Sequence, residues 1–294
     1  MSEFPEQEVE ISHELIQALV EDQLPKFAGE SVVRQNSGWD NQLYRLGLQY
    51  LVRIPRRKLG ADHVEHESTF LPRLAPKLPL PIPVPIFVGQ PGHGYPWRWT
   101  VIERFRGETV DESPLQPGEA VKLANFLKVL HQQDPTGAPD NPFRGGYLHD
   151  RTPWFEERWE RLVQAREEVA TDDILQKWRD GVGAMPSQEE RLIHGDLHPY
   201  NLLAKDGRIS AVLDWGDLTA GDVATDLCCA WLVFEHQSEI EAFFQAYSLP
   251  DEATYLRARS WAIHFATIFL DTGITTDPRS KNVGRAALSR IAES

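Results

Sequence analysis

The chain has 294 residues, 41% of them hydrophobic, which is enough to build one large domain or two lobes with their own cores. Its 44 acidic and 30 basic residues give a net charge of −14, which disfavours binding to nucleic acid and to anionic lipid. No run of about 18 uncharged apolar residues occurs and the acidic N-terminus has no signal-peptide core, so the sequence predicts a cytoplasmic protein that does not span a membrane.

The first third of the chain carries mainly the pattern of strands. A helix precedes them, because Ser12 is a suitable N-cap and Pro25 ends the apolar periodicity that follows it. Stretches rich in β-branched and aromatic residues then predict strands at 31–35, 42–48, 50–54, 85–88 and 97–104. A turn-forming run separates the first two, so the early strands are predicted to be consecutive and antiparallel. A helix from about Ala61 is predicted to be disturbed at Pro72, whose ring removes a backbone donor.

The rest of the chain is mainly helical in pattern. Apolar residues at three- and four-residue spacings predict helices from Pro117 onward and at 154–169, 224–247 and 254–270. Two short strand-like runs around an Asp-Gly turn predict a small hairpin at 202–213. The chain is therefore predicted to be an α+β protein with two lobes, residues 1–104 and 105–294, and a cleft between them.

Residues 194–201 read His-Gly-Asp-Leu-His-Pro-Tyr-Asn, and the sequence Asp-Trp-Gly follows the hairpin at 214–216. Phosphoryl transfer needs a carboxylate that orients and deprotonates the attacking hydroxyl, together with oxygen ligands that hold Mg²⁺ against the phosphates. Asp196 supplies the first group, and Asn201 and Asp214 supply hard oxygen ligands for the second. The hairpin turn is predicted to bring Asp214 close to Asn201.

These two motifs, HGDLHPYN and VLDWGD, resemble those of the aminoglycoside phosphotransferase family, relatives of the protein kinases and of the choline, fructosamine and macrolide kinases. The resemblance covers nearly the whole chain. It implies a bilobal protein-kinase-like fold, with a β-rich N-terminal lobe that binds nucleotide and a mainly helical C-terminal lobe for catalysis and acceptor binding. It also implies that Asp196 is the catalytic base and that Asn201 and Asp214 bind Mg²⁺.

The function implied by this resemblance is transfer of the γ-phosphoryl group of ATP or GTP to a hydroxyl of an aminoglycoside-like or other small-molecule acceptor. Macrolides, choline-like amines, sugars and metabolites are alternatives. An acidic set in the C-terminal lobe offers partners for the ammonium groups of a cationic acceptor: Asp217, Asp222, Glu235, Glu239 and Glu241. The same residues are also typical of an ordinary solvated helix face.

The expected nucleotide side departs from the protein-kinase pattern. Only Gly38 stands in the turn where a glycine-rich loop is usual, and Arg53 occupies the position of the strand lysine. A guanidinium still binds phosphate and stays charged. Glu67 falls at a core-facing helical spacing, so it is predicted to pair with Arg53, with a solvated glutamate as the alternative. By resemblance, the backbone groups of Glu103 and Phe105 would face the nucleobase.

Two other classes of protein remain open on the sequence. The missing lysine and the sparse glycine loop are compatible with a catalytically inactive nucleotide-binding protein of the same fold. His194, Asp196 and His198 also form an H-x-D-x-H pattern that is compatible with a metal-dependent hydrolase, although that interpretation leaves Asn201 and Asp214 without a role. A structural role for His194, orienting the backbone around Asp196, is favoured.

Overall fold

A computed structural model describes residues 6–35 and 38–294, which form two compact units. Of the described residues, the first unit contains 6–35, 38–77, 81–106 and 214–216, and the second contains 78–80, 107–213 and 217–294. The main passage from one unit to the other thus follows Arg106, two residues after the boundary expected from the sequence. The Asp-Trp-Gly segment groups with the first unit although it lies far along the chain.

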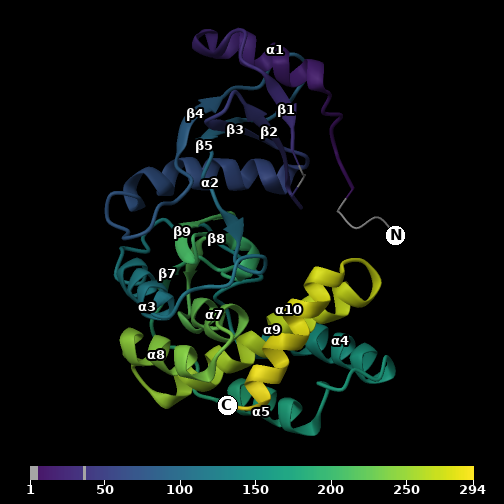
Figure 1. Cartoon of the computed structure of the whole chain (residues 1–294), viewed down its shortest axis with the longest axis vertical. Helices are drawn as coiled ribbons and strands as arrows, with labels where there is room; N and C mark the ends of the chain where they lie inside the picture. Colours follow the sequence, from purple (N-terminus) through teal and green to yellow (C-terminus); the bar gives the residue numbers. More distant parts are fainter. Residues whose placement is uncertain (1–5, 36–37) are drawn as a thin grey trace. The chain divides into compact units, whose positions relative to one another are not determined.

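The first unit is built on one antiparallel sheet with strand order β1-β2-β3-β5-β4 (Figure 1). Its strands are β1 (Val32–Arg34), β2 (Asn41–Leu46), β3 (Tyr50–Pro55), β4 (Pro85–Gly89) and β5 (Trp99–Glu103). Each corresponds to a strand predicted from β-branched and aromatic content. The turn predicted at 36–41 lies partly outside the described residues, because Asn36 and Ser37 are not among them.

Helices cover the two faces of this sheet (Figure 1). Val52 and Ile54 of β3 join the core that also holds the buried side of α1 (His13–Gln23). Because side chains alternate along a strand, Arg53 points to the opposite face, where it meets α2 (Lys58–Leu74). The alternation therefore brings a charged residue of the central strand against a helix. A short 3₁₀ turn, η1 (Pro25–Phe27), follows α1.

The helix α2 differs from its prediction in two ways. It begins at Lys58 rather than near Ala61, and it continues through Pro72 to end at Leu74. Pro72 lies within the last turn of α2, and its ring removes one backbone N–H donor. Only the last residues of the helix come after it, so the missing donor leaves the rest of the helix intact. The predicted disturbance at Pro72 is therefore wrong.

The second unit is mainly helical and packs around one long, buried helix. This helix, α9 (Glu252–Thr275), has buried side chains on all sides and contacts most of the other helices of the unit (Figure 1). The other helices are α3 (Glu119–Leu130), α4 (Thr152–Gln164), α5 (Asp172–Gly183), α6 (Ala224–Leu227), α7 (Cys229–Val233), α8 (Gln237–Tyr247) and α10 (Pro278–Ala292), with 3₁₀ turns η2 (Leu148–Arg151) and η3 (Pro199–Asn201).

Short strands in the second unit hold the segment that carries the motif. The predicted hairpin is present as β8 (Leu202–Lys205) and β9 (Arg208–Val212), joined to β6 (Glu108–Thr109). A separate antiparallel pair joins β7 (Arg191–Ile193) to β10 (Thr219–Gly221). The motif at 194–201 therefore runs from the end of β7 through η3 to the start of β8, with paired strands on both sides.

Several predicted helices of this unit differ from the observed ones. The single helix predicted at 224–247 is divided, because Phe234 is extended and ends α7 before α8 begins. The helix predicted at 154–169 ends at Gln164, shortly before Arg166 turns left-handed with φ of 56°. Helices α5 and α10 were not predicted. Among the described residues, no helix combines the length and apolar character needed to cross a membrane.

Candidate functional site

The loop after β7 is shaped by a glycine and a buried carboxylate. Gly195 has φ of 86°, a conformation that favours glycine, and a Cβ there would lie 2.5 Å from the Asp217 carbonyl oxygen. Behind the loop, the fully buried Asp226 accepts hydrogen bonds from the N–H groups of His194 and Gly195, both at 2.8 Å. Asp226 is therefore buried and bonded to backbone, and it fixes the backbone just before Asp196.

Asp196 lies at the end of this braced loop with both carboxylate oxygens engaged. Its Oδ1 accepts from Arg144 Nη2 at 2.8 Å, and its Oδ2 accepts from His198 Nε2 at 3.2 Å and Asn201 Nδ2 at 3.1 Å. Burial by itself raises the pKa of the Asp196 carboxyl, but His198 and Arg144 hold that pKa well below its ordinary value. The carboxylate is therefore ionised at neutral pH and available to accept a proton or a hydrogen bond.

Asn201 is oriented by its amide nitrogen. That nitrogen donates to the carbonyl oxygen of Asp196 at 2.8 Å as well as to the carboxylate. The amide oxygen is thereby left as the group that can bind a cation, and amide and carboxylate oxygens are the donors that Mg²⁺ prefers. The backbone carbonyl oxygen of Asn201 accepts from the N–H of Leu213, at 2.8 Å, and Leu213 is the residue directly before Asp214 in the chain.

In both histidines of the motif, each ring nitrogen makes a hydrogen bond within the protein. His194 donates from Nε2 to the Leu213 carbonyl oxygen at 2.8 Å and accepts at Nδ1 from the Asp196 N–H at 3.2 Å. His198 uses Nδ1 to accept from the Tyr200 N–H at 3.3 Å and Nε2 to bind Asp196. His194 therefore has the structural role favoured from the sequence. Within the described residues, no three His, Cys, Asp or Glu side chains are grouped to hold a metal ion.

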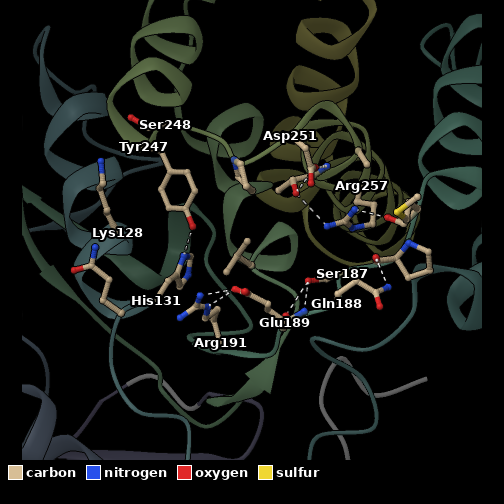
Figure 2. Close-up of a pocket in the computed structure, with 17 residues that line it drawn as sticks. Lys128, His131, Ser187, Gln188, Glu189, Arg191, Tyr247, Ser248, Asp251 and Arg257 are labelled. Atoms are coloured by element: carbon tan, nitrogen blue, oxygen red, sulfur yellow. Dashed lines mark hydrogen bonds and ion pairs between the residues drawn. The ribbon is translucent and has the colours of Figure 1, made fainter.

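The brace behind the motif extends to the wall of a cavity in the second unit. His131 binds Asp226 Oδ2 through Nε2 at 3.0 Å and Tyr247 Oη through Nδ1 at 2.8 Å. Figure 2 shows His131 and Tyr247 pointing toward one another at one side of this cavity, which has a volume of about 500 Å³. Arg257 lies on another side and is paired with the buried Asp222 at 2.6 Å. A series of hydrogen bonds from Tyr247 through His131 to Asp226 thus connects this wall to the backbone of the motif.

The first unit carries Asp214 and the predicted ion pair. Asp214 is exposed and has φ of 55°. Arg53 donates to both carboxylate oxygens of Glu67, at 2.6 and 3.1 Å, and both residues are buried. Burial by itself lowers the pKa of Arg53, but Glu67 and Asp214 together raise it above its ordinary value. The predicted pair is present, and the charge of Arg53 is also felt by Asp214.

The other residues predicted on the nucleotide side lie in the same unit. Gly38 donates its N–H to the Asn41 carbonyl oxygen at 2.9 Å, and a Cβ at this position would meet only an ordinary contact at 3.7 Å. The backbone here does not itself require glycine. Glu103 is exposed and pairs with Tyr50 at the end of β5, and Phe105 follows it in the connection to the second unit.

Two arginines of one segment, one of which contacts Asp196, were missed from the sequence. Arg144 contacts the Asp196 carboxylate, and Arg151 ties back to the same segment by donating to the Pro142 carbonyl oxygen at 2.9 Å. Both come from the connection between α3 and α4, about fifty residues before the motif. No local spacing links them to Asp196, so no signal in the sequence identifies them.

Comparison with known proteins agrees with this architecture. Residues 31–261 match the phosphotransferase enzyme family. The uncharacterized protein YcbJ of Bacillus subtilis (strain 168) is 28% identical over 131 residues. That match covers 42% of this chain and 41% of YcbJ, so the chain spans about two fifths of that curated relative.

Solved structures show the same fold over nearly the whole chain. The complex of APH(2")-IIia with GDP and kanamycin gives a TM-score of 0.71 at 19% identity, covering 94% of this chain and 98% of that one. The macrolide 2'-phosphotransferase MphH from Brachybacterium faecium gives a TM-score of 0.60 at 19% identity, with 94% and 97% covered. This α+β fold and the family match confirm the resemblance of the two motifs. The chain therefore belongs to the phosphotransferase enzyme family, the family of the aminoglycoside phosphotransferases.

Proposed function

We propose that this chain is a small-molecule kinase that transfers the γ-phosphoryl group of ATP or GTP to a hydroxyl of its acceptor. The observation that carries the proposal is the carboxylate of Asp196, which is held ionised at the end of a loop braced by Asp226. Membership of the phosphotransferase family supports the reaction class. The similar structure that contains GDP and kanamycin supports a nucleotide donor and a small-molecule alcohol as acceptor.

Asp196 acts as the base in this mechanism. Its carboxylate accepts a hydrogen bond from the acceptor hydroxyl and takes its proton as the hydroxyl oxygen attacks the γ-phosphorus. The bond from the γ-phosphorus to the bridging oxygen breaks, and the nucleoside diphosphate leaves with that oxygen. His198 and Asn201 hold one carboxylate oxygen of Asp196 in place, so the other oxygen, now bound by Arg144, is the one that meets the acceptor.

The roles proposed on the nucleotide side follow from charge and donor type. Asn201 and Asp214 would hold Mg²⁺, which when bound offsets the charge of the phosphates. Arg53, fixed by Glu67, would bind phosphate oxygens through its guanidinium in place of the usual lysine. Gly38 would approach the phosphates, and the backbone at Glu103 and Phe105 would face the base of the nucleotide.

The test is Mg²⁺-dependent release of nucleoside diphosphate from ATP and from GTP by the purified chain. The acceptor panel comprises aminoglycosides, macrolides, amino alcohols, sugars and hydroxy acids. We expect one class to stimulate release and to appear as a phosphorylated product. Tight nucleotide binding without release, with and without every acceptor, would instead favour an inactive nucleotide-binding protein of this fold.

A further inference from the structure

Arg151 is a buried cation without a carboxylate to neutralise it. The residue is 8% exposed, and its guanidinium lies 4.8 Å from the centre of the Trp154 ring while donating to the Pro142 carbonyl oxygen. Asp150 attracts its charge from nearby, but in the part of the chain that the structure describes no ion pair joins Arg151 to an acid. Buried charges are as a rule paired, so the remaining N–H donors of Arg151 are suited to an anionic ligand.

Arg144 brings a second guanidinium from the same segment, and its charge acts on Arg151. It lies between Asp196 at 2.8 Å and Asp217 at 3.5 Å, with its face 4.9 Å from the Phe265 ring. Its Nε is buried and has no hydrogen-bond partner among the described residues. Burial lowers the pKa of Arg151, and the charge of Arg144 lowers it further. The two cations therefore repel each other, and an oxyanion bound by both would relieve that repulsion.

The positive charge of these arginines also lowers the pKa of a buried histidine. His264 on α9 has its pKa lowered to about 3, first by burial and then by the charges of Arg144, Arg158 and Arg151. Three arginines thus act on one neutral imidazole, in a chain whose net charge is −14, and one of them, Arg144, contacts Asp196. Arg158 has a carboxylate partner, Asp271, at 3.8 Å, which sets it apart from Arg151.

The segment of residues 142–154, named here the arginine segment, is anchored on both sides of Arg144. Asn141 donates to Asp217 Oδ1 at 2.6 Å, directly before the segment. Gly145 accepts from the Asp222 N–H at 2.9 Å, and a Cβ at Gly145 would lie only 2.9 Å from the Gly221 Cα. The backbone on either side of Arg144 is therefore fixed, and its guanidinium is positioned by the fold rather than by chance contact.

The arginine segment also presents aromatic side chains to solvent. Phe143 is 53% exposed, Tyr147 is 63% exposed and Trp154 is 46% exposed. Trp154 lies against the Arg151 guanidinium, and an exposed aromatic group beside a polar donor is typical of a small-molecule site, where it contacts the apolar part of the ligand. Their presence within thirteen residues favours an acceptor with an apolar or aromatic body.

Two acids of the second unit already have cationic partners and are poorly suited to a polycationic acceptor. Asp217 already binds Asn141 and Arg144, and the buried Asp222 is neutralised by Arg257 at 2.6 and 3.3 Å. These are two of the residues that the sequence offered as partners for ammonium groups. An ammonium group next to the reacting hydroxyl would meet the guanidinium of Arg144, and like charges at that distance repel.

We propose that Arg151 and Arg144 bind an oxyanion of the acceptor, so that the acceptor is an alcohol that also carries a carboxylate or a phosphate. Its apolar body lies against the exposed aromatic side chains of the arginine segment. This inference rests on the proposed kinase function for the phosphoryl step, but the binding step stands apart from it. Arg151 is the group that binds the anion, and Arg144 links that anion to the Asp196 carboxylate.

The test is equilibrium binding, measured by titration calorimetry without nucleotide or Mg²⁺. The probes share one aromatic body and differ in charge: phenyllactate and benzyl phosphate are anionic, phenylpropanediol is neutral and phenylalaninol is cationic. We expect at least one anion to bind about tenfold or more tightly than the neutral diol, and Arg151→Gln to abolish that preference. Arg151→Lys keeps the charge without the planar fork and should give an intermediate affinity.

The exposed Arg208 on β9 provides a matched control, since Arg208→Gln removes the same charge from a strand that pairs with β8 and should leave binding unchanged. Thermal unfolding of each variant confirms that it is folded. Equal affinity for the anions and the neutral diol, or an unchanged preference in a folded Arg151→Gln variant, would overturn the inference. A preference for only one anion identifies the oxyanion. Failure of nucleotide turnover would bear on the kinase proposal alone, because these titrations contain no nucleotide.

Discussion

The buried His264 makes the free energy of unfolding decrease as the pH falls below neutral. Its pKa falls from 6.5 to about 3 on folding, chiefly because the ring is buried. Between these values the unfolded chain binds one more proton than the folded chain, so stability falls as the pH falls below 6.5. pH 5 lies about 1.5 pH units below the pKa of His264 in the unfolded chain. The free energy of unfolding is therefore about 2 kcal/mol lower at pH 5 than at neutral pH.

The assay is denaturant unfolding of the wild type and of His264→Phe at a series of pH values. His264 Nδ1 has no hydrogen-bond partner among the described residues, and the ring packs 6.1 Å from Trp178 and 5.7 Å from Trp261, so phenylalanine suits the site. We expect the wild type to lose about 2 kcal/mol more than the variant between neutral pH and pH 5. Equal losses would refute the assignment of a neutral, buried imidazole at this position.

Three further predictions concern the first unit. Glu67→Leu leaves Arg53 buried and unpaired and should lower the free energy of unfolding by about 3–5 kcal/mol in denaturant unfolding. Adding Arg53→Leu to Glu67→Leu should recover most of that loss. A double variant as unstable as the single one would contradict the pairing. Asp214→Asn should raise the Mg²⁺ concentration needed for half-maximal turnover in a magnesium titration, and an unchanged midpoint would remove Asp214 from the metal site. Gly216→Ala should cost about 1–3 kcal/mol of stability, because its Cβ would lie 2.6 Å from His63 Nδ1, and His63→Ala in the same chain should relieve that cost in thermal unfolding.

The fold could be predicted where the sequence pattern is local. Alternating β-branched residues gave the five-stranded sheet, and the N-cap at Ser12 gave α1. Helices α5 and α10 were missed, although the caps Thr171 and Asp277 mark their starts. Residues 224–234 are buried throughout, so no alternation of apolar and polar side chains marks the break at Phe234.

The site could be predicted only in part, for a similar reason. Asp196 and Asn201 lie within one short loop, so their hydrogen bond follows from local spacing. The pairing of Arg53 with Glu67 also follows from one strand and the next helix. Arg144 reaches Asp196 only because contacts distant in sequence hold its backbone against β10 and the following loop. Such contacts leave no periodic signal in a single sequence.

The measurement that tests the central claim most directly is transfer of the γ-phosphoryl group by the wild type beside Asp196→Asn, with ATP and GTP and the acceptor panel. Asp206→Asn, an equivalent change at an exposed turn, is the control. Asp196→Asn should lower the rate about 10²- to 10⁴-fold while leaving nucleotide affinity unchanged, and the control should match the wild type. Equal rates for wild type and Asp196→Asn would contradict the assignment of Asp196 as the base.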